Sequence, residues 1–406
     1  MQQLDHLQIL LDLVKAFDAV SREALWIVMR KFGMPDHFIN IVTRLHTGAT
    51  IKLKIGDTDS DIPSTIGVRQ GSCEGPALFL FMIQAALETM EWPAAKPQFC
   101  TREKGPITGA SSSRKRGVTK FDLWSSLFAD DCALLFKTRG DMIAGANYIA
   151  SHFKRFGLLM HVGRGQTPSK TEAVFYPAPR QPHSAGDQTD FTCDGNGFIS
   201  FTSEFIYLGS VIHHSLTCEA DVDRRIAKAS AAFGALQQSF FKSRIPALED
   251  KGRVFVALVL SILLYGSECW CLRERELQRL RVFYNRCVRS MCKVTMKQVF
   301  VHHISTEELL ERLSIRSLDY YYTTRLLRWT GHVARMPMTR TPRRLLTSWV
   351  DHKRLVGAPA MTIGRTINKA LSRRGISTDF ATWRALAQDR GSWRSTIDPL
   401  GVNNKH

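Results

Sequence analysis

Two adjacent carboxylates, Asp130 and Asp131, lie in the stretch SSLFADDCALLFK between two apolar runs that are typical of strands. Like charges side by side repel each other and titrate against each other. A polar hairpin turn would explain the pair, because Asp is common in turns. Asp12 offers a second explanation, since it ends another apolar run, HLQILLDL. If these strands lie side by side in one sheet, we expect the three carboxylates to meet at one end of it.

Three converging carboxylates are unstable without a cation. Hard oxygen ligands of this kind suit Mg²⁺. Two such ions about 4 Å apart can activate a 3′-hydroxyl and stabilise a leaving pyrophosphate. The carboxylates are therefore candidate ligands for such a pair of ions.

The elements that must position these carboxylates follow from hydrophobic periodicity and capping signals. Up to about residue 212 the sequence predicts strands mixed with helices, and from about residue 218 it predicts amphipathic helices alone. Two polar stretches interrupt the mixed part, a solvated insertion over 93–120 and a turn-rich stretch over 177–197. The predicted strands cover 6–12, 50–56, 60–67, 125–137, 171–177 and 198–212. The predicted helices cover 21–33, 35–48, 77–90, 141–157, 219–241, 249–265, 273–292, 306–335, 361–374 and 379–389.

The charge of the chain points to a polyanionic partner. Its 55 Lys and Arg residues outnumber 37 Asp and Glu residues, giving a formal net charge of +18. The first 100 residues hold nine basic and eleven acidic residues, so the excess lies in the remainder. We expect nucleic acid as the partner rather than an anionic membrane, because no helix combines a basic face with an apolar insertion face.

Nine cysteines occur at irregular spacings, and no secretory signal precedes them. This pattern favours reduced thiols in an intracellular compartment over a disulfide framework. A zinc site is a weaker alternative, because the gaps between its candidate ligands are not of the close-pair type. Those candidates are Cys269, Cys271, Cys287, Cys292, His302 and His303.

Five strings occur in a fixed order: DLVKAFDAV, GVRQGSCEGPALF, FADD, SKTE and FIYLGSVI. Together they resemble the palm motifs of reverse transcriptases of non-LTR (LINE-like) retrotransposons. The later strings LLYGSECW, LRWTGHVARMP and WRALAQDRGSWR resemble the C-terminal part of the same polyproteins. The resemblance implies an α+β fold with a polymerase palm over 1–212, including the insertion loop 93–120. A thumb-like helical region would follow over 213–295, and a basic helical region over 296–406.

The resemblance also implies roles for the carboxylates. Asp12 and Asp130 would be ligands of two Mg²⁺ ions, with Mn²⁺ as an alternative metal. Asp131 would complete the cluster, and the backbone carbonyl of Leu13 would add a further ligand. Of the adjacent pair, we expect Asp130 to be the indispensable member.

Four residues would contact the incoming nucleotide in such an enzyme. The ring of Phe17 would lie beneath the sugar and exclude a 2′-hydroxyl, which selects dNTP over rNTP; a core aromatic is the alternative. Gln70 and Gly71 would contact the nucleotide and the template, unless the glycines of this loop only form turns. Lys170 would lie near the phosphates and donate a proton to the leaving group, or it is an exposed lysine before a strand.

The remaining predicted contacts are with nucleic acid. The turn Tyr207, Leu208 and Gly209 resembles the primer grip, which presses on the primer end. Sequence-independent phosphate contacts are predicted for Arg69, Arg224, Arg225 and Lys228, with a solvated helix face as the alternative for the last three. Trp329, with Arg325, Arg328 and Arg335, could form a stacking surface, but a core position for Trp329 is the stronger prediction.

The chain departs from the family pattern in two respects. The fingers motifs that precede DLVKAFDAV in the family are absent from this sequence, and Cys73 and Glu74 stand where smaller or apolar residues are usual. We therefore expect an N-terminally truncated chain with weak or no activity. The partners would be an RNA template, a DNA primer or target and dNTP, in the nucleus or in a cytoplasmic ribonucleoprotein. The alternative function is a catalytically inactive nucleic-acid-binding remnant.

Overall fold

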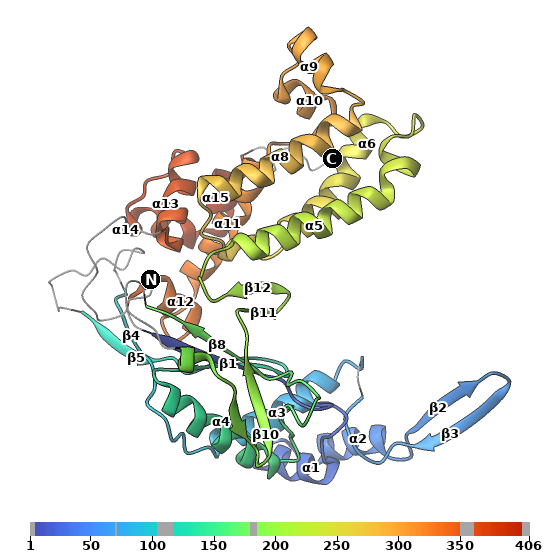
Figure 1. Cartoon of the computed structure of the whole chain (residues 1–406), viewed down its shortest axis with the longest axis vertical. Helices are drawn as coiled ribbons and strands as arrows, with labels where there is room; N and C mark the ends of the chain where they lie inside the picture. Colours follow the sequence, from blue (N-terminus) through green and yellow to red (C-terminus); the bar gives the residue numbers. More distant parts are fainter. Residues whose placement is uncertain (1–4, 70, 104–116, 179–184, 350–360, 400–406) are drawn as a thin grey trace. The chain divides into compact units, whose positions relative to one another are not determined.

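The computed structural model describes residues 5–69, 71–103, 117–178, 185–349 and 361–399. Two compact units make up the chain (Figure 1). The sheet unit consists of Gln2–Pro97 and Asp122–Ser203, and the helical unit of Gln98–Phe121 and Glu204–His406. The chain therefore passes from one unit to the other between residues 97 and 98, between 121 and 122, and between 203 and 204, whereas the sequence predicts a single boundary at 212.

A six-stranded sheet forms the centre of the sheet unit, with the strand order β6-β7-β1-β8-β10-β9. Neighbouring strands are antiparallel except for β8 and β10, which are parallel. The predicted α+β class is confirmed. The strands are β1 (His6–Leu11), β6 (Ser125–Phe128), β7 (Asp131–Phe136), β8 (Glu172–Tyr176), β9 (Phe191–Cys193) and β10 (Gly197–Phe201).

Helices and one sheet face share a single apolar core in this unit. In β1 every second residue is buried, which places Leu7, Ile9 and Leu11 in the core. Ser21 caps the first helix by accepting a hydrogen bond from the Ala24 N–H, as the sequence predicts. The helices are α1 (Arg22–Lys31), α2 (Asp36–His46), α3 (Gly75–Glu88) and α4 (Arg139–Lys154), and a 3₁₀ turn covers Ala185–Gln188.

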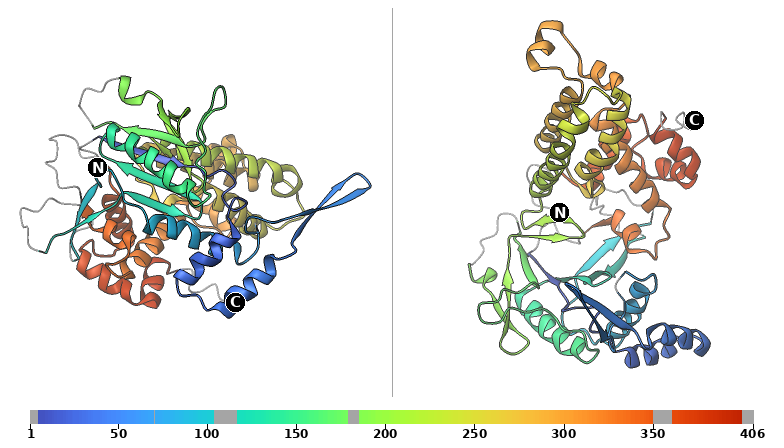
Figure 2. Two further views of the ribbon diagram at one scale, coloured as in Figure 1. Left: turned by 90° about the horizontal axis from the view of Figure 1, so that it is seen from below. Right: turned by 90° about the vertical axis from the view of Figure 1, so that its right-hand side faces the viewer.

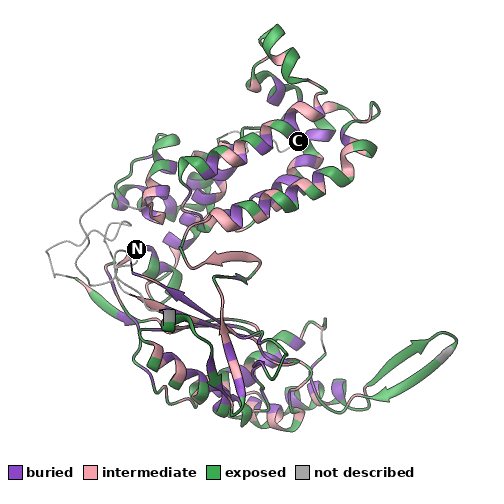
Figure 3. Cartoon of the chain, in the orientation of Figure 1, coloured by how far each residue is buried: buried purple, intermediate pink, exposed green. Residues whose placement is uncertain are grey.

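A two-stranded ribbon follows α2. Its strands, β2 (Thr50–Ile55) and β3 (Thr58–Pro63), pair only with each other within the described part of the chain. Figures 1 and 2 show the ribbon extending away from α1 and α2, and Figure 3 shows that both of its strands are exposed.

The helical unit begins with a hairpin of β11 (Glu204–Tyr207) and β12 (Ser210–His213), followed by helices that pack around two cores. Leu326 and Leu327 in α11 belong to the second of these cores, and Trp329 is half-buried against it, as predicted. The α-helices are α5 (Glu219–Leu236), α6 (Leu248–Val254), α7 (Ser261–Leu263), α8 (Glu274–Met291), α9 (Met296–His302), α10 (Thr306–Arg312), α11 (Leu318–Arg335), α12 (Thr341–Leu346), α13 (Ile363–Arg373), α14 (Phe380–Gln388) and α15 (Arg390–Ile397). Two π-helical segments, Gln237–Phe241 and Phe255–Leu260, and a 3₁₀ turn, Ser267–Cys269, lie between them.

The predicted solvated insertion is partly structured. It contains β4 (Gln98–Thr101) and the first half of β5 (Thr119–Asp122), which join β13 (Ser348–Trp349) in a small sheet. Cys100 and Thr101 are buried there, and the Thr101 hydroxyl donates a hydrogen bond to the Arg344 carbonyl at 3.0 Å. The solvated assignment was therefore wrong for β4, because its partner strand lies more than 200 positions later. Residues 104–116 of the insertion lie outside the described residues.

Two further sequence predictions concern cysteines and membranes. All nine cysteines are free thiols. In the ranges that the structure describes, no group of three His, Cys, Asp or Glu residues could hold a metal ion, which includes the candidate zinc ligands. Nor do these ranges contain a helix that is long and apolar enough to cross a membrane.

Candidate active site

Asp12 follows the central strand of the sheet directly. On one side β1 pairs with β7, with Leu11 opposite Cys132, and on the other it pairs with β8, with Leu10 opposite Glu172. Continuing the register with β7 past the end of β1 brings Asp12 opposite Asp131. The pairing with β8 stops at Leu10, and the Asp12 carbonyl accepts the His161 N–H instead. Because directly opposed residues share a sheet face, two carboxylates predicted from separate strings lie together.

The neighbouring pair of carboxylates occupies a tight hairpin turn. Phe128 pairs with Asp131, so Ala129 and Asp130 alone connect β6 and β7. Ala129 has a φ of 54°, whereas Asp130 does not enter the positive-φ region. A side chain at such a φ costs about 1 kcal/mol or more, and glycine usually occupies this position. The prediction of a hairpin turn is confirmed, and the turn carries backbone strain.

The electrostatics of the turn reflect the three carboxylates. Partial burial, followed by the charges of Asp130 and Asp12, raises the pKa of Asp131. None of the three side chains makes a hydrogen bond or an ion pair with another described residue. Their oxygens are therefore free to bind a cation, although the side chains are not grouped around a metal position in this conformation.

The backbone around Asp12 is firmly held. Its N–H donates to the Thr171 hydroxyl at 3.2 Å, and its carbonyl accepts the His161 N–H at 2.8 Å. Leu13 forms an antiparallel bridge with Met160. The hydrogen bonds on either side of this bridge involve Asp12 and Val14. The Leu13 carbonyl accepts no hydrogen bond from a described residue, so its oxygen is free to bind a metal ion.

Phe17 and the glycine-rich loop lie next to each other. The Val68 N–H donates to the Phe17 carbonyl at 2.9 Å, and the Gly67 N–H to the Val20 carbonyl at 2.8 Å. A Cβ on Gly67 would lie only 2.8 Å from the Asp18 carbonyl oxygen, so this approach requires glycine.

The Phe17 ring itself is half-buried and stacks on Phe79 with a centroid separation of 4.8 Å, so it has features of both a core residue and a site residue. Gly71 follows with a φ of 83°, as a turn-forming glycine does. Arg69 is exposed. Gln70 lies outside the described residues.

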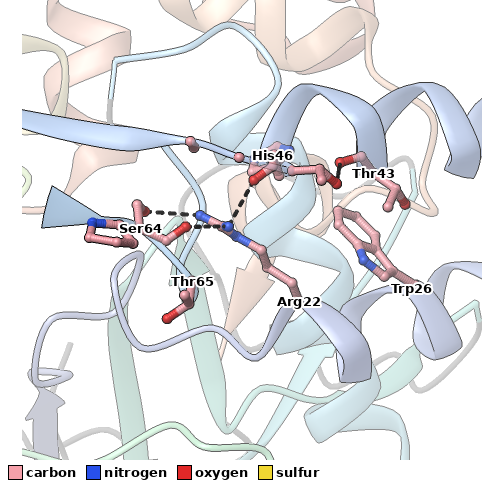
Figure 4. Close-up of a pocket in the computed structure, with 10 residues that line it drawn as sticks. Arg22, Trp26, Thr43, His46, Ser64 and Thr65 are labelled. Atoms are coloured by element: carbon pink, nitrogen blue, oxygen red, sulfur yellow. Dashed lines mark hydrogen bonds between the residues drawn. The ribbon is translucent and has the colours of Figure 1, made fainter. Parts of the chain in front are cut away.

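Arg22 fixes the start of this loop. Its guanidinium donates hydrogen bonds to the carbonyls of His46, Ser64, Ile66 and Gly67 and to the Ser64 hydroxyl, at 2.7–3.1 Å. Figure 4 shows this residue at the wall of a cavity of about 280 Å³, together with Trp26, Thr43 and Thr65. Burial and the charge of Arg69 lower the pKa of Arg22.

Lys170 is exposed, and its backbone N–H donates to Nδ1 of His161 at 3.2 Å. Its ammonium group makes no hydrogen bond or ion pair with a described residue. The position is therefore compatible with a phosphate contact and equally with an exposed lysine before a strand.

The predicted primer grip forms a two-residue turn in the helical unit. Leu208 and Gly209 have φ values of 48° and 82°, which is the pattern of a type I′ hairpin. The Tyr265 hydroxyl donates to the Leu208 carbonyl at 3.0 Å, and the Arg225 guanidinium donates to the Gly209 carbonyl. The shape of this turn is therefore fixed by α5 and by the chain after α7.

The three basic residues predicted on α5 do not share an exposed face. Arg225 is only 4% exposed and pairs with Asp221 at 3.6 Å, so its assignment to phosphate binding was wrong. Arg224 is half-buried, with one buried guanidinium nitrogen that lacks a hydrogen bond. Lys228 alone is exposed.

The arginines of α11 are also occupied within the helical unit. Arg325 pairs with Glu268 at 2.7 Å, and Arg328 with Asp398 at 2.7 Å. Arg335 donates to the carbonyl of Ala387. These contacts favour a structural role for this stretch.

Comparison with known proteins decides the family. The family model described as reverse transcriptase (RNA-dependent DNA polymerase) matches residues 2–210, about half of the chain. The chain belongs to the reverse transcriptase family.

Two relatives of the chain are proteins of mobile elements. A transposon-derived protein of Caenorhabditis elegans is 28% identical over 200 residues, which are 48% of this chain and 70% of that protein. The Pol polyprotein of the type-1 retrotransposable element R2 of Nasonia vitripennis is 25% identical over 184 residues, 44% of this chain and 16% of the polyprotein. The predicted relation to non-LTR retrotransposons is confirmed.

The sequence did not predict the residues of this chain that position the candidate site without forming it. Thr171 lies inside the string SKTE, but only its neighbour Lys170 was singled out. Arg22 is the first residue of α1, where a positive charge is unfavourable. This unusual position is a sequence signal that its side chain has another role. His161 gave none, because its contact with Asp12 depends on the fold.

Proposed function

We propose that the chain is the polymerase core of an RNA-directed DNA polymerase. A primer 3′-hydroxyl would attack the α-phosphate of a dNTP on an RNA template and release pyrophosphate. The single observation that carries this proposal is the register of β1 with β7, which joins Asp12 to the Asp130 turn within the stretch that matches the family. In this proposal the sheet unit is the palm, and the helical unit contains the thumb.

The carboxylates suit a divalent metal by their chemistry. They offer hard oxygen ligands, partial burial followed by their mutual repulsion raises the pKa of Asp131, and no described cation neutralises them. Asp12, Asp130, Asp131 and the Leu13 carbonyl would hold two Mg²⁺ ions, with Mn²⁺ as the alternative metal. When bound, such ions activate the 3′-hydroxyl and stabilise the charge on the leaving group.

Other residues of the chain would orient the substrates. The Phe17 ring, held by Phe79 and by the loop at Val68, would lie beneath the sugar and exclude a 2′-hydroxyl. Gln70 and Gly71 would contact the nucleotide and template, and Arg69 a phosphate. Lys170 would donate a proton to the leaving pyrophosphate. The turn Tyr207–Gly209 would hold the primer end.

A primer-extension assay tests this function. The chain is incubated with a poly(rA) template, an oligo(dT) primer, dTTP and Mg²⁺, beside the variants Asp130→Asn and Asp36→Asn. We expect Asp130→Asn to reduce incorporation at least about 100-fold. Asp36, which pairs with Arg30 on the surface and is 75% exposed, is the matched control and should keep full activity.

Each outcome decides a point. Incorporation that survives Asp130→Asn would overturn the role of this residue. Because weak activity is expected, the wild-type chain is compared with Asp130→Asn over a long incubation. A wild-type chain that binds the template and primer but extends them no more than Asp130→Asn does would overturn the polymerase assignment of this chain and favour the nucleic-acid-binding remnant.

A further inference from the structure

The backbone ladder between β1 and β8 ends just before Asp12. The last paired residues are Leu10 and Glu172. Beyond them, the Asp12 N–H donates to a side chain, the Thr171 hydroxyl, at 3.2 Å. Thr171 is 0% exposed although it neighbours the exposed Lys170. A buried hydroxyl thus replaces the next ladder bond at the residue where the carboxylate must be placed.

His161 links the same two segments from the other side. Its N–H donates to the Asp12 carbonyl at 2.8 Å, and its carbonyl accepts the Thr171 N–H at 3.2 Å. Its ring Nδ1 accepts the Lys170 N–H at 3.2 Å. The residues at 12, 161, 170 and 171 therefore form one connected hydrogen-bond network.

Ser169 supports this network from within the chain. Its hydroxyl lies 2.6 Å from the Thr171 carbonyl and 3.3 Å from the His161 carbonyl, and the residue is 8% exposed. Buried polar groups that are fully paired hold a single geometry, whereas one lost partner leaves a desolvated group behind. The site of Thr171 is therefore sensitive to loss of the hydroxyl and tolerant of a change that keeps it.

We propose that Thr171 is a positioning residue for Asp12, and that the His161 ring sets the position of Lys170 relative to it. This inference rests on the proposed polymerase function. Thr171 accepts a hydrogen bond from the main-chain N–H of Asp12. It therefore fixes the position of the Asp12 backbone and does not alter the charge of the carboxylate. Within this network the His161 ring bonds to Lys170 and not to Asp12. We therefore expect Thr171 to affect metal binding and kcat, and the His161 ring to affect the KM for dNTP.

Three threonine variants separate positioning from general stability. Thr171→Val removes the hydroxyl and keeps the shape, Thr171→Ser keeps the hydroxyl, and Thr167→Val changes an exposed threonine in the same loop. Amide hydrogen exchange at Asp12 should become faster in Thr171→Val alone. Mn²⁺ binding, followed by electron paramagnetic resonance without substrates, should weaken about 10-fold in that variant. Its kcat should fall while the KM for dNTP stays constant.

His161→Ala provides a complementary result. It removes the acceptor for the Lys170 N–H and keeps the backbone bond to Asp12. We expect the KM for dNTP to rise about fivefold with Mn²⁺ binding unchanged, since a single hydrogen bond contributes about 1 kcal/mol.

The outcomes are distinguishable from failure of the proposed function. Unchanged exchange at Asp12 and unchanged Mn²⁺ binding in Thr171→Val would overturn the inference. A loss of thermal stability that Thr171→Ser does not rescue would mean that Thr171 is only structural. If the wild-type chain neither binds Mn²⁺ nor extends a primer, the proposed function fails, whereas the exchange measurement still decides whether Thr171 holds Asp12.

Discussion

Two groups of aspartates in this chain have opposite surroundings. In the sheet unit, the side chains of Asp12, Asp130 and Asp131 have no hydrogen-bonding or ionic partner among the described residues. In the helical unit, Asp221 accepts hydrogen bonds from the Trp270 indole at 2.8 Å and the Val211 N–H at 3.0 Å and pairs with Arg225.

The difference separates a structural carboxylate from the carboxylates that we propose as metal ligands. Asp221 is 3% exposed, and a buried charge persists only when it is paired and hydrogen-bonded. The carboxylates of the sheet unit are partly open to water and repel one another, so they contribute nothing to stability through contacts. Charge left without partners at the end of a central strand is better explained by a ligand than by the fold.

The largest expected effect comes from removing the Asp221 carboxylate, which is hydrogen-bonded and paired. Asp221→Ala leaves Arg225 as an unpaired buried charge and two N–H groups without acceptors. We expect the free energy of unfolding to fall by about 3–5 kcal/mol, measured by urea denaturation. A variant as stable as the wild type would show that Asp221 does not stabilise the hairpin of β11 and β12.

A smaller effect is expected on the pH dependence of the free energy of unfolding. The sign of this effect differs between Asp131 and Asp319. Because the folded chain raises the pKa of Asp131 above 3.8, charging this group destabilises the fold as the pH rises through the folded pKa. Asp131→Asn should therefore raise the free energy of unfolding at pH 7 by under about 1 kcal/mol, since the site is open to solvent. This gain should shrink as the pH falls toward 4.

Asp319 provides the opposite control. Hydrogen bonds from Arg281, at 2.6 and 2.7 Å, lower the pKa of Asp319 below 3.8. Its stabilisation is present above the ordinary pKa and is lost as the pH falls through the folded pKa. Asp319→Asn should thus destabilise the chain at pH 7 and have less effect in acid. If the free energy of unfolding of Asp131→Asn and of Asp319→Asn changed in the same direction with pH, the contrast between the two carboxylates would be wrong.

The smallest effect is expected on the outer face of α5. Lys228 is exposed and makes no ion pair with a described residue, so Lys228→Ala should change the free energy of unfolding by less than about 0.5 kcal/mol. If Lys228 contacts a phosphate, the slope of log affinity for RNA against log salt concentration should fall by about 1. Filter binding across a salt series measures this slope.

The sequence predicted the parts of the site that depend on local pattern. The runs around Asp12 and Asp130 have the composition of strands, and the Asp pair suits a turn, so the meeting of the carboxylates at one sheet end followed from strand adjacency. The helix cap at Ser21 also follows from a local signal.

Long-range contacts could not be predicted in the same way. Arg22 binds carbonyls up to 45 positions away, and Thr171 bonds to a residue 159 positions away. Arg225 has the same spacing as a solvated helical arginine, and only tertiary packing shows that it is buried. For β4, polar neighbours in the sequence concealed a strand whose partner is β13.

The ribbon of β2 and β3 has a consequence for the solubility of the protein. Lys52 and Lys54 lie opposite Asp61 and Asp59, so one strand carries only positive and the other only negative charges on that face. Two chains that meet through the same strand would bring like charges together. Charged side chains of this kind suppress edge-to-edge pairing, which keeps a ribbon that displays Ile51, Leu53 and Ile55 to water from starting aggregation.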